Sequence, residues 1–108
     1  MHIEVFRYRV NPDFKDEFTT LYAQMQQCIQ SIDGYIGHKV FTADDGEKVL
    51  IGYFEHADAI AQWDVHPEHK QAKARGRDAV FAHYDVIVAH VEERHRSESA
   101  PAIETPLA

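Results

Sequence analysis

The chain has 108 residues, which is the size of one domain. Its formal net charge is −7, from 18 acidic and 11 basic residues, so it lacks the basic surface that binds nucleic acids or anionic membranes. The single cysteine excludes an internal disulfide and a cysteine-based metal cluster, and no apolar run approaches the length that spans a bilayer. The first residues lack the basic segment and the apolar run of a signal peptide, so we expect a cytoplasmic protein.

The first third of the chain predicts a strand followed by a helix. Residues 2–10 are rich in Ile, Val, Phe and Tyr, which favour a strand. Residues 11–13 supply a helix start, with asparagine at the cap, proline next and an acid in the first turn. From residue 14 to residue 32 apolar side chains recur every three or four positions, which predicts a helix of about five turns. Gly34 is a typical stop for it.

The middle of the chain predicts a hairpin and a broken helix. Residues 35–42 and 48–54 read as two strands, joined by the tight-turn sequence Asp-Asp-Gly at residues 44–46. Residues 57–65 look helical, and a further helical stretch extends from the proline at 67 to the glycine at 76.

Residues 80–91 predict a long fourth strand. The order strand-helix-strand-strand-helix-strand is that of an α+β, ferredoxin-like (βαββαβ) fold with an antiparallel sheet. We assign residues 1–94 to this domain. Residues 95–108 have the serine and proline content of a linker, and we expect them to form a tail that lies across a partner subunit.

The third and fourth strands are apolar on both faces. In residues 48–54, Val49, Ile51 and Tyr53 point one way and Leu50 and Phe54 the other. In residues 80–91, Val80, Ala82, Tyr84, Val86 and Val88 share one face and Phe81, Ile87 and Val91 the opposite one. A strand that is apolar on both sides is buried on both sides, yet the helices of this fold cover only one face of the sheet. We therefore expect a homodimer in which a second sheet packs on the open face; the alternative is a monomer with scattered surface apolar residues.

Serine, glycine and cysteine contexts argue against several enzyme classes. Ser31, Ser97 and Ser99 lack the strand-turn-helix context of a nucleophilic serine, and no glycine-rich phosphate loop occurs. Cys28 lies on the apolar stripe of the first helix, which favours a buried structural thiol over a nucleophile.

The chain has eight histidines, which is its most unusual feature. His66 and His69 could reach one metal ion, but the sequence does not locate a third ligand. The simpler interpretation is a polar helix start with exposed imidazoles, so we expect no metal. His38, His83 and His90 fall in predicted strands, either as core residues or as pocket linings.

Trp63 is the only tryptophan and lies on a short predicted helix. Burial in the core is the simplest interpretation, because burying the large ring is favourable. Trp63 also directly precedes the helix break at residues 66–69, a usual place for a pocket mouth, so it is a candidate wall of a pocket. The basic residues at 70–77 indicate either a solvated helix face or a cationic rim for an anionic or phenolate ligand.

Three segments resemble the antibiotic biosynthesis monooxygenase (ABM) family. They are residues 32–37 (Ile-Asp-Gly-Tyr-Ile-Gly), 51–55 (Ile-Gly-Tyr-Phe-Glu) and 63–69 (Trp-Asp-Val-His-Pro-Glu-His), and the Gly-Arg pair at 76–77 fits too. The resemblance covers about residues 2–93. It implies a dimeric α/β barrel with one pocket per subunit between sheet and helices. Family members include monooxygenases that oxidise phenolic or quinol-like aromatics without metal or flavin, and others that bind and degrade haem.

The resemblance implies that Trp63 lines the pocket. His69 stands where many members have a histidine or, in the aromatic-oxidising branch, a tyrosine. The haem branch depends on an asparagine in the first strand and on a histidine late in the second helix. Residues 5–8 contain no asparagine, and the helix beyond His69 has lysine and arginine instead of histidine, so we do not expect haem degradation.

The first hypothesis is therefore a cofactor-independent monooxygenase that oxidises a small phenolic or quinol-like aromatic with O2. A histidine would take the substrate proton, since its pKa of about 6.5 is near working pH. The candidate residues are His69 and His83 for catalysis, and Trp63, Tyr8, Phe6, Tyr84 and His66 for substrate binding. A second hypothesis is a non-catalytic dimeric module for small apolar ligands, favoured if the pocket holds no titratable group. A third is haem binding through His66 or His69.

Overall fold

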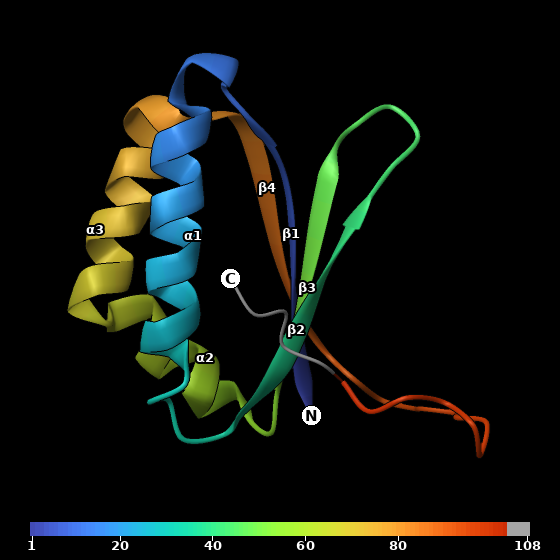
Figure 1. The fold of residues 1–108 in the computed structure, drawn as a ribbon. Coiled ribbons are helices and arrows are strands. Elements are labelled where there is room, and N and C mark those ends of the chain that lie inside the picture. Colours follow the sequence, from blue (N-terminus) through green and yellow to red (C-terminus); the bar gives the residue numbers. More distant parts are fainter. Residues whose placement is uncertain (104–108) are drawn as a thin grey trace.

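The computed structural model describes residues 1–103 and has the predicted α+β, ferredoxin-like fold (Figure 1). One antiparallel sheet has the strand order β2-β3-β1-β4. Its strands are β1 (His2–Val10), β2 (Tyr35–Thr42), β3 (Lys48–Phe54) and β4 (Phe81–His90). The helices α1 (Lys15–Ile29), α2 (Ala57–Val65) and α3 (Pro67–Arg75) lie together on one side of the sheet (Figure 1).

Local hydrogen bonds determine where α1 begins and ends. The Asn11 side chain accepts a bond from the Asp13 amide, and Pro12–Phe14 form a 3-10 turn before the helix. α1 ends at Ile29, three residues before the predicted end. The amides of Ser31 and Ile32 bond back three residues instead of four, which tightens the chain into a turn. Gly34 then adopts a φ of 95°, a conformation that glycine tolerates.

The break between α2 and α3 occurs at His66, as predicted. The His66 backbone amide bonds to the Trp63 carbonyl, and its Nδ1 accepts a bond from the Glu68 amide. Pro67 begins α3 and has no amide hydrogen. In a continuous helix that amide would bond to the Trp63 carbonyl, so the proline leaves this carbonyl available to other donors.

The last strand begins differently from the prediction. Residues Gly76–Val80 form a π-helical turn, and β4 starts at Phe81. The register shifts within the first residues of β4, where Val10 pairs with Phe81 and Arg9 with His83. Val80 and Phe81 both line the space between sheet and helices, which corrects the prediction that they lie on opposite faces. Gly76 makes this possible, since a Cβ there would lie only 2.6 Å from the Phe81 ring.

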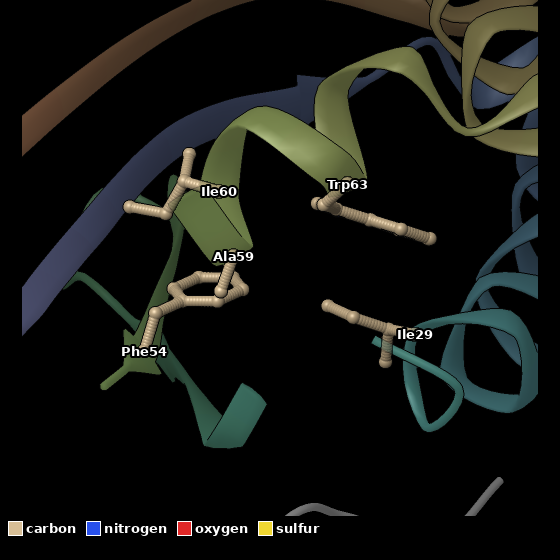
Figure 2. Packing of buried hydrophobic residues seen from close by; sticks show 5 residues of the cluster. All are labelled: Ile29, Phe54, Ala59, Ile60 and Trp63. Carbon is tan, nitrogen blue, oxygen red and sulfur yellow. The ribbon is translucent and has the colours of Figure 1, made fainter. Parts of the chain in front are cut away.

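The hydrophobic core lies where α2 and the end of α1 meet β3. Trp63, Ile60 and Ala59 of α2 form one buried cluster with Phe54 of β3 and Ile29 of α1 (Figure 2). All five side chains are at most 9% exposed. Trp63 is thus a core residue and, as described below, also part of a cavity wall.

The sheet face away from the helices is apolar. Val5 pairs with Ile51 on one side and with Ile87 on the other, and Ile3 pairs with Tyr53. Alternation places these side chains opposite the helix-facing positions of the same strands. None of the helices in residues 1–103 covers this face (Figure 1), and Ile87 is 50% exposed. The third and fourth strands are therefore apolar on both faces, as predicted.

Residues 91–103 contain no helix or strand and extend away from the body of the domain (Figure 1). Arg96 bonds to the carbonyls of Ala100 and Pro101 within this segment. The predicted tail continues through residues 104–108, which lie outside the described residues, so its role as an intersubunit arm stays a prediction. No helix in the described part of the chain is both long and apolar enough to cross a membrane.

Candidate functional site

A cavity of about 650 Å³ lies between the sheet and the helices. This volume is within the range of sites that hold drug-sized ligands. Its walls are mostly apolar and come from every layer of the fold. The sheet contributes Phe6, Leu50, Phe54, Phe81, Tyr84 and Val86, and the helices contribute Phe18, Leu21, Met25, Ile29 and Trp63.

The floor of the cavity is a row of three residues across the sheet. Glu4 of β1 pairs with Gly52 of β3, and Gly52 pairs with His38 of β2. All three line the cavity. Because neighbouring strands are about 4.8 Å apart, the backbones of Glu4 and His38 are separated by about 10 Å. Gly52 adds no side chain between the acid and the imidazole, and the Phe54 ring and Leu50 lie within 4 Å of the position that a Cβ would take there.

Glu4 is a partly buried acid among apolar side chains. Burial and, to a smaller extent, the nearby Asp64 carboxylate raise its pKa to about 7, although Lys73 opposes the shift. A carboxyl with such a pKa changes between its protonated and ionised forms near neutral pH, which suits proton transfer. Sequence analysis did not identify Glu4. The sequence did contain an indication: Glu4 is a charged residue on the same face of the predicted strand as the aromatic residues Phe6 and Tyr8.

His69 stacks on Trp63, with ring centroids 3.9 Å apart and planes 11° apart. Its Nδ1 lies 2.8 Å from the Trp63 carbonyl oxygen, the atom that Pro67 leaves without its helical partner. A carbonyl oxygen only accepts, so Nδ1 carries the proton and Nε2 keeps its lone pair. Burial lowers the pKa of His69 to about 4, although the bond to Trp63 opposes this shift. His69 is therefore neutral near pH 7.

His38 is 4% exposed and bonds to two tyrosines. Its Nε2 lies 2.9 Å from the Tyr22 hydroxyl and its Nδ1 lies 2.6 Å from the Tyr35 hydroxyl. Burial lowers the pKa of His38, so the imidazole is neutral and has one donor and one acceptor. One tyrosine therefore donates to the ring and the other accepts from it. Sequence analysis left open whether His38 is a core residue or a pocket lining; it is buried and also lines the cavity.

The structure brings some of the predicted site residues together and separates others. Phe6, Trp63, His69 and Tyr84 line the cavity. The remaining three predicted residues, Tyr8, His66 and His83, are not among its lining residues.

The three predicted residues that do not line the cavity lie elsewhere in the fold. Tyr8 is 3% exposed and packs among Phe6, Phe18 and Phe81, and burial raises its pKa to about 12. His66 caps α3. His83 is exposed and pairs with Arg9, one position before the helix-facing Tyr84, so it lies on the opposite face of the sheet. Of the two candidate catalytic histidines, His69 is the one that borders the cavity.

The basic residues of α3 and the following turn divide into two groups. Lys70, Lys73 and Arg77 line the cavity, where they form a cationic rim. Lys73 also bonds to the Asp64 carbonyl at 2.9 Å. Arg75 instead forms two bonds, of 2.7 and 2.8 Å, with the Glu17 carboxylate of α1.

Within residues 1–103, no group of three or more His, Cys, Asp and Glu side chains has the arrangement of a metal site. Cys28 donates a hydrogen bond to Glu68, at 2.9 Å. Burial and this acceptor raise the pKa of the thiol to about 11, so it stays protonated near neutral pH. A protonated thiol is a poor nucleophile, in keeping with a structural cysteine.

The family model for antibiotic biosynthesis monooxygenases (ABM) matches residues 1–75. The chain belongs to this family. The ABM match includes β1, the floor residues Glu4, His38 and Gly52, and the stacked pair Trp63 and His69. The protein YqjZ of Bacillus subtilis (strain 168) is 31% identical over 84 residues, which are 74% of each chain.

Solved structures share the ABM fold. Rv0793 from Mycobacterium tuberculosis superposes with a TM-score of 0.75 at 18% identity, over 88% of this chain and 98% of that one. SnoaB, a cofactor-independent oxygenase from Streptomyces nogalater, superposes with a TM-score of 0.71 at 16% identity, over 86% of this chain and 94% of its own. At these identities the similarity concerns the fold alone.

Proposed function

We propose that this ABM protein is a cofactor-independent monooxygenase that oxidises a small phenolic or quinol-like aromatic with O2. The observation that carries the proposal is a largely apolar cavity lined by Glu4 and by His69, which stacks on Trp63. An apolar cavity suits an aromatic substrate, and groups with shifted pKa values in such a cavity are typical of catalytic sites. The shared fold with the oxygenase SnoaB supports the same reaction class.

The reaction needs one proton acceptor and a dry site. Glu4 takes a proton from the substrate, and the resulting anion passes one electron to O2. The two radicals combine at carbon into a peroxide anion, which takes the proton back from Glu4. The resulting hydroperoxide loses water and leaves a carbonyl. The substrate carbon loses two hydrogens and four electrons; one oxygen atom enters the product and the other leaves as water. Lys73 and Arg77 on the cavity rim stabilise the substrate anion.

Glu4 is a better proton acceptor than His69, although the sequence analysis proposed His69 as the base. The pKa of Glu4 is about 7 and that of His69 about 4. The difference of about three units corresponds to about a thousandfold in basicity. His69 has a different role in this proposal: its unprotonated Nε2 accepts a hydrogen bond from the substrate hydroxyl, while the ring and Trp63 hold the aromatic.

The non-catalytic binding module is the second candidate. A cavity without titratable groups favours it, whereas this cavity contains Glu4 and His69. No observation favours the third hypothesis, haem binding. We still expect the protein not to degrade haem. For either function, we propose a homodimer formed through the apolar face of the sheet, as the family resemblance implies.

Oxygen uptake by the purified protein tests the proposed reaction. We expect O2 consumption with an anthrone or a dihydroxynaphthalene without added metal or flavin. Glu4→Gln should lower kcat by about 10²–10⁴-fold, the usual contribution of a general base. Glu55→Gln is the matched control, since Glu55 is exposed and outside the cavity lining. Ligand binding without oxygen uptake across a panel of phenols and quinols would favour the binding module instead.

A further inference from the structure

Gln26 is a polar side chain buried in the wall of the cavity. It belongs to α1 and is 8% exposed. Neither its amide nitrogen nor its amide oxygen has a hydrogen-bond partner within residues 1–103. Tyr22 lies one turn earlier on the helix: burial raises the pKa of its hydroxyl, and a side-chain hydrogen bond with Gln26 lowers it. This contact falls outside the usual distance and angle limits of a hydrogen bond, so it is weak and leaves both polar atoms of Gln26 without a well-formed bond in this part of the chain.

An amide buried without partners destabilises a protein, so nearly all buried polar groups in native proteins are paired. Gln26 faces the cavity, where a ligand can supply the missing bonds. An apolar residue of the same size would fill this wall at a lower cost in stability. The retained amide therefore points to a polar group that enters the cavity from outside the chain.

The cavity has a charged side and a neutral side. The charged lining residues, Glu4, Asp64, Lys70, Lys73 and Arg77, come from β1, α2, α3 and the turn after it. The lining residues of α1 and β2 are uncharged. They include Gln26, Tyr22 and His38, and the Tyr22–His38 bond joins α1 to β2. A ligand that reaches Gln26 thus meets neutral partners, and this wall is held in place by hydrogen bonds.

The Gln26 carboxamide presents N–H donors and a C=O acceptor side by side on one planar edge. Its complement is a planar edge that carries an acceptor beside a donor, which is the pairing that glutamine makes with adenine. A carboxylate has acceptors only and would leave Oε1 of Gln26 unpaired. A ketone or an ether would leave the same atom unpaired.

We propose that Gln26 forms a specificity subsite that binds a neutral carboxamide or lactam edge of an aromatic ligand, whose other end reaches Glu4 across Gly52. This inference rests on the proposed function only in placing the substrate in this cavity. Glu4 and His38 are at opposite ends of the floor, and the Tyr22–His38 bond joins His38 to the helix that carries Gln26, so one planar molecule can contact Glu4 and Gln26.

Two isomeric probes test the subsite by calorimetric titration. 4-Methyl-2-quinolinone has an N–H beside its carbonyl, whereas 1-methyl-2-quinolinone has the same atoms but no N–H. We expect the first isomer to bind about tenfold more tightly, the usual value of one additional hydrogen bond. Neither probe is a phenol or a quinol, so the result is independent of any oxygen chemistry. Failure of the oxygenase proposal would appear only in the oxygen-uptake assay.

Gln26→Leu and Gln27→Leu form a matched pair of variants. Both residues lie on α1, but Gln27 is exposed and outside the cavity lining. The preference for the 4-methyl isomer should disappear in Gln26→Leu and persist in Gln27→Leu. The ligand-free Gln26→Leu protein should also have a higher Tm than the wild type, because the unpaired amide is gone.

Several results would overturn the inference. They are equal affinity of the wild type for the two isomers, no binding of the 4-methyl isomer, and a preference that survives in Gln26→Leu. A Tm that falls in Gln26→Leu but not in Gln27→Leu, or a Gln26→Leu chain that does not fold, would show that the amide already has partners inside the protein.

Discussion

Glu4 lies on the central strand β1 and faces the helices between apolar neighbours. A carboxylate at this position is poorly solvated, which is why its pKa is raised to about 7. The ionised form therefore lowers the stability of the folded protein. Residues that cost stability in this way are common at functional sites, where activity requires them.

Glu4→Gln should change stability in a pH-dependent way. The pKa of Glu4 is about 7 in the folded protein against a reference value of 4.5. Below pH 4.5 the carboxyl is protonated in both states, and above pH 7 it is ionised in both. The wild type therefore loses the contribution of Glu4 as pH rises through this window, and the variant does not. The free energy of unfolding of the variant relative to wild type should increase by about 2 kcal/mol from pH 4.5 to pH 8, after a discount for partial exposure.

Urea denaturation at both pH values measures this difference. His69→Ala provides a contrast, since its folded pKa of about 4 lies below the reference value of 6.5. The free energy of unfolding of His69→Ala relative to wild type should therefore increase as pH falls from 6.5 to 4, whereas that of Glu4→Gln increases as pH rises. A Glu4→Gln effect of equal size at both pH values would contradict the raised pKa.

The pH dependence of the rate distinguishes the two proton acceptors. If ionised Glu4 is the base, kcat/KM should rise about tenfold per pH unit and level off near pH 7. His69→Ala should keep this inflection at a lower rate, because the variant loses only a hydrogen-bond acceptor and part of the wall. An inflection near pH 4 that disappears in His69→Ala would return the role of base to His69.

At the scale of elements, short helices and the strand register assemble the site. Pro67 separates α2 from α3 and frees the Trp63 carbonyl, which then fixes the tautomer of His69. On the opposite wall, the register of β1, β3 and β2 aligns Glu4, Gly52 and His38 in one row. Gly52 in that row adds no side chain of its own to the floor, which the Phe54 ring and Leu50 border on either side.

Side chains added at Gly52 should fill the cavity without breaking β3. A Cβ at this position would lie 3.3 Å from the Phe54 ring and 3.9 Å from Leu50, so small adjustments accommodate it. Gly52→Ala should weaken ligand binding slightly, and Gly52→Leu should weaken it by more than about tenfold, since it takes the space of the ligand. Calorimetric titration measures the affinity, and circular dichroism checks that the fold is retained. Binding to Gly52→Leu at wild-type affinity would show that the ligand does not lie over the floor.

At the scale of the whole molecule, the main feature is the apolar face of the sheet that no helix in residues 1–103 covers (Figure 1). Val5, Ile51 and Ile87 lie side by side there across three strands. Apolar patches of this kind on a small domain are usually covered by a partner. The domain is also small, so burying this face adds a large share of apolar area.

We predict a homodimer that Val5→Glu disrupts. The wild type should sediment at equilibrium as twice the chain mass at micromolar concentration. The buried carboxylate of the variant should shift the equilibrium to monomer, because an unpaired charge in an apolar interface is very unfavourable. Val65→Glu is the matched control, since Val65 is 62% exposed on α2. A monomeric wild type would show that the open face tolerates water.

Much of the fold could be predicted from the sequence because its signals are local. The cap at Asn11, the stop at Gly34 and the break at Pro67 act through a residue's own backbone or its nearest neighbours. The apolar alternation of the strands and the stripe of α1 likewise depend only on side-chain periodicity. Trp63 was predicted from the helix break that follows it and from the family resemblance, and His69 from the resemblance.

The tertiary structure alone decided the polar part of the site. Glu4, His38 and Gly52 are far apart in the chain and meet only through strand pairing. The position of His83 on the far face depends on the pairing of β4 with β1, since one residue along a strand reverses the side. The position of His69 in the cavity depends on how α3 packs over the sheet. The pKa values of Glu4 and His69 depend on how much water the assembled layers remove. Desolvation is a property of the packed molecule, which is why a sequence pattern predicts the elements but not the chemistry between them.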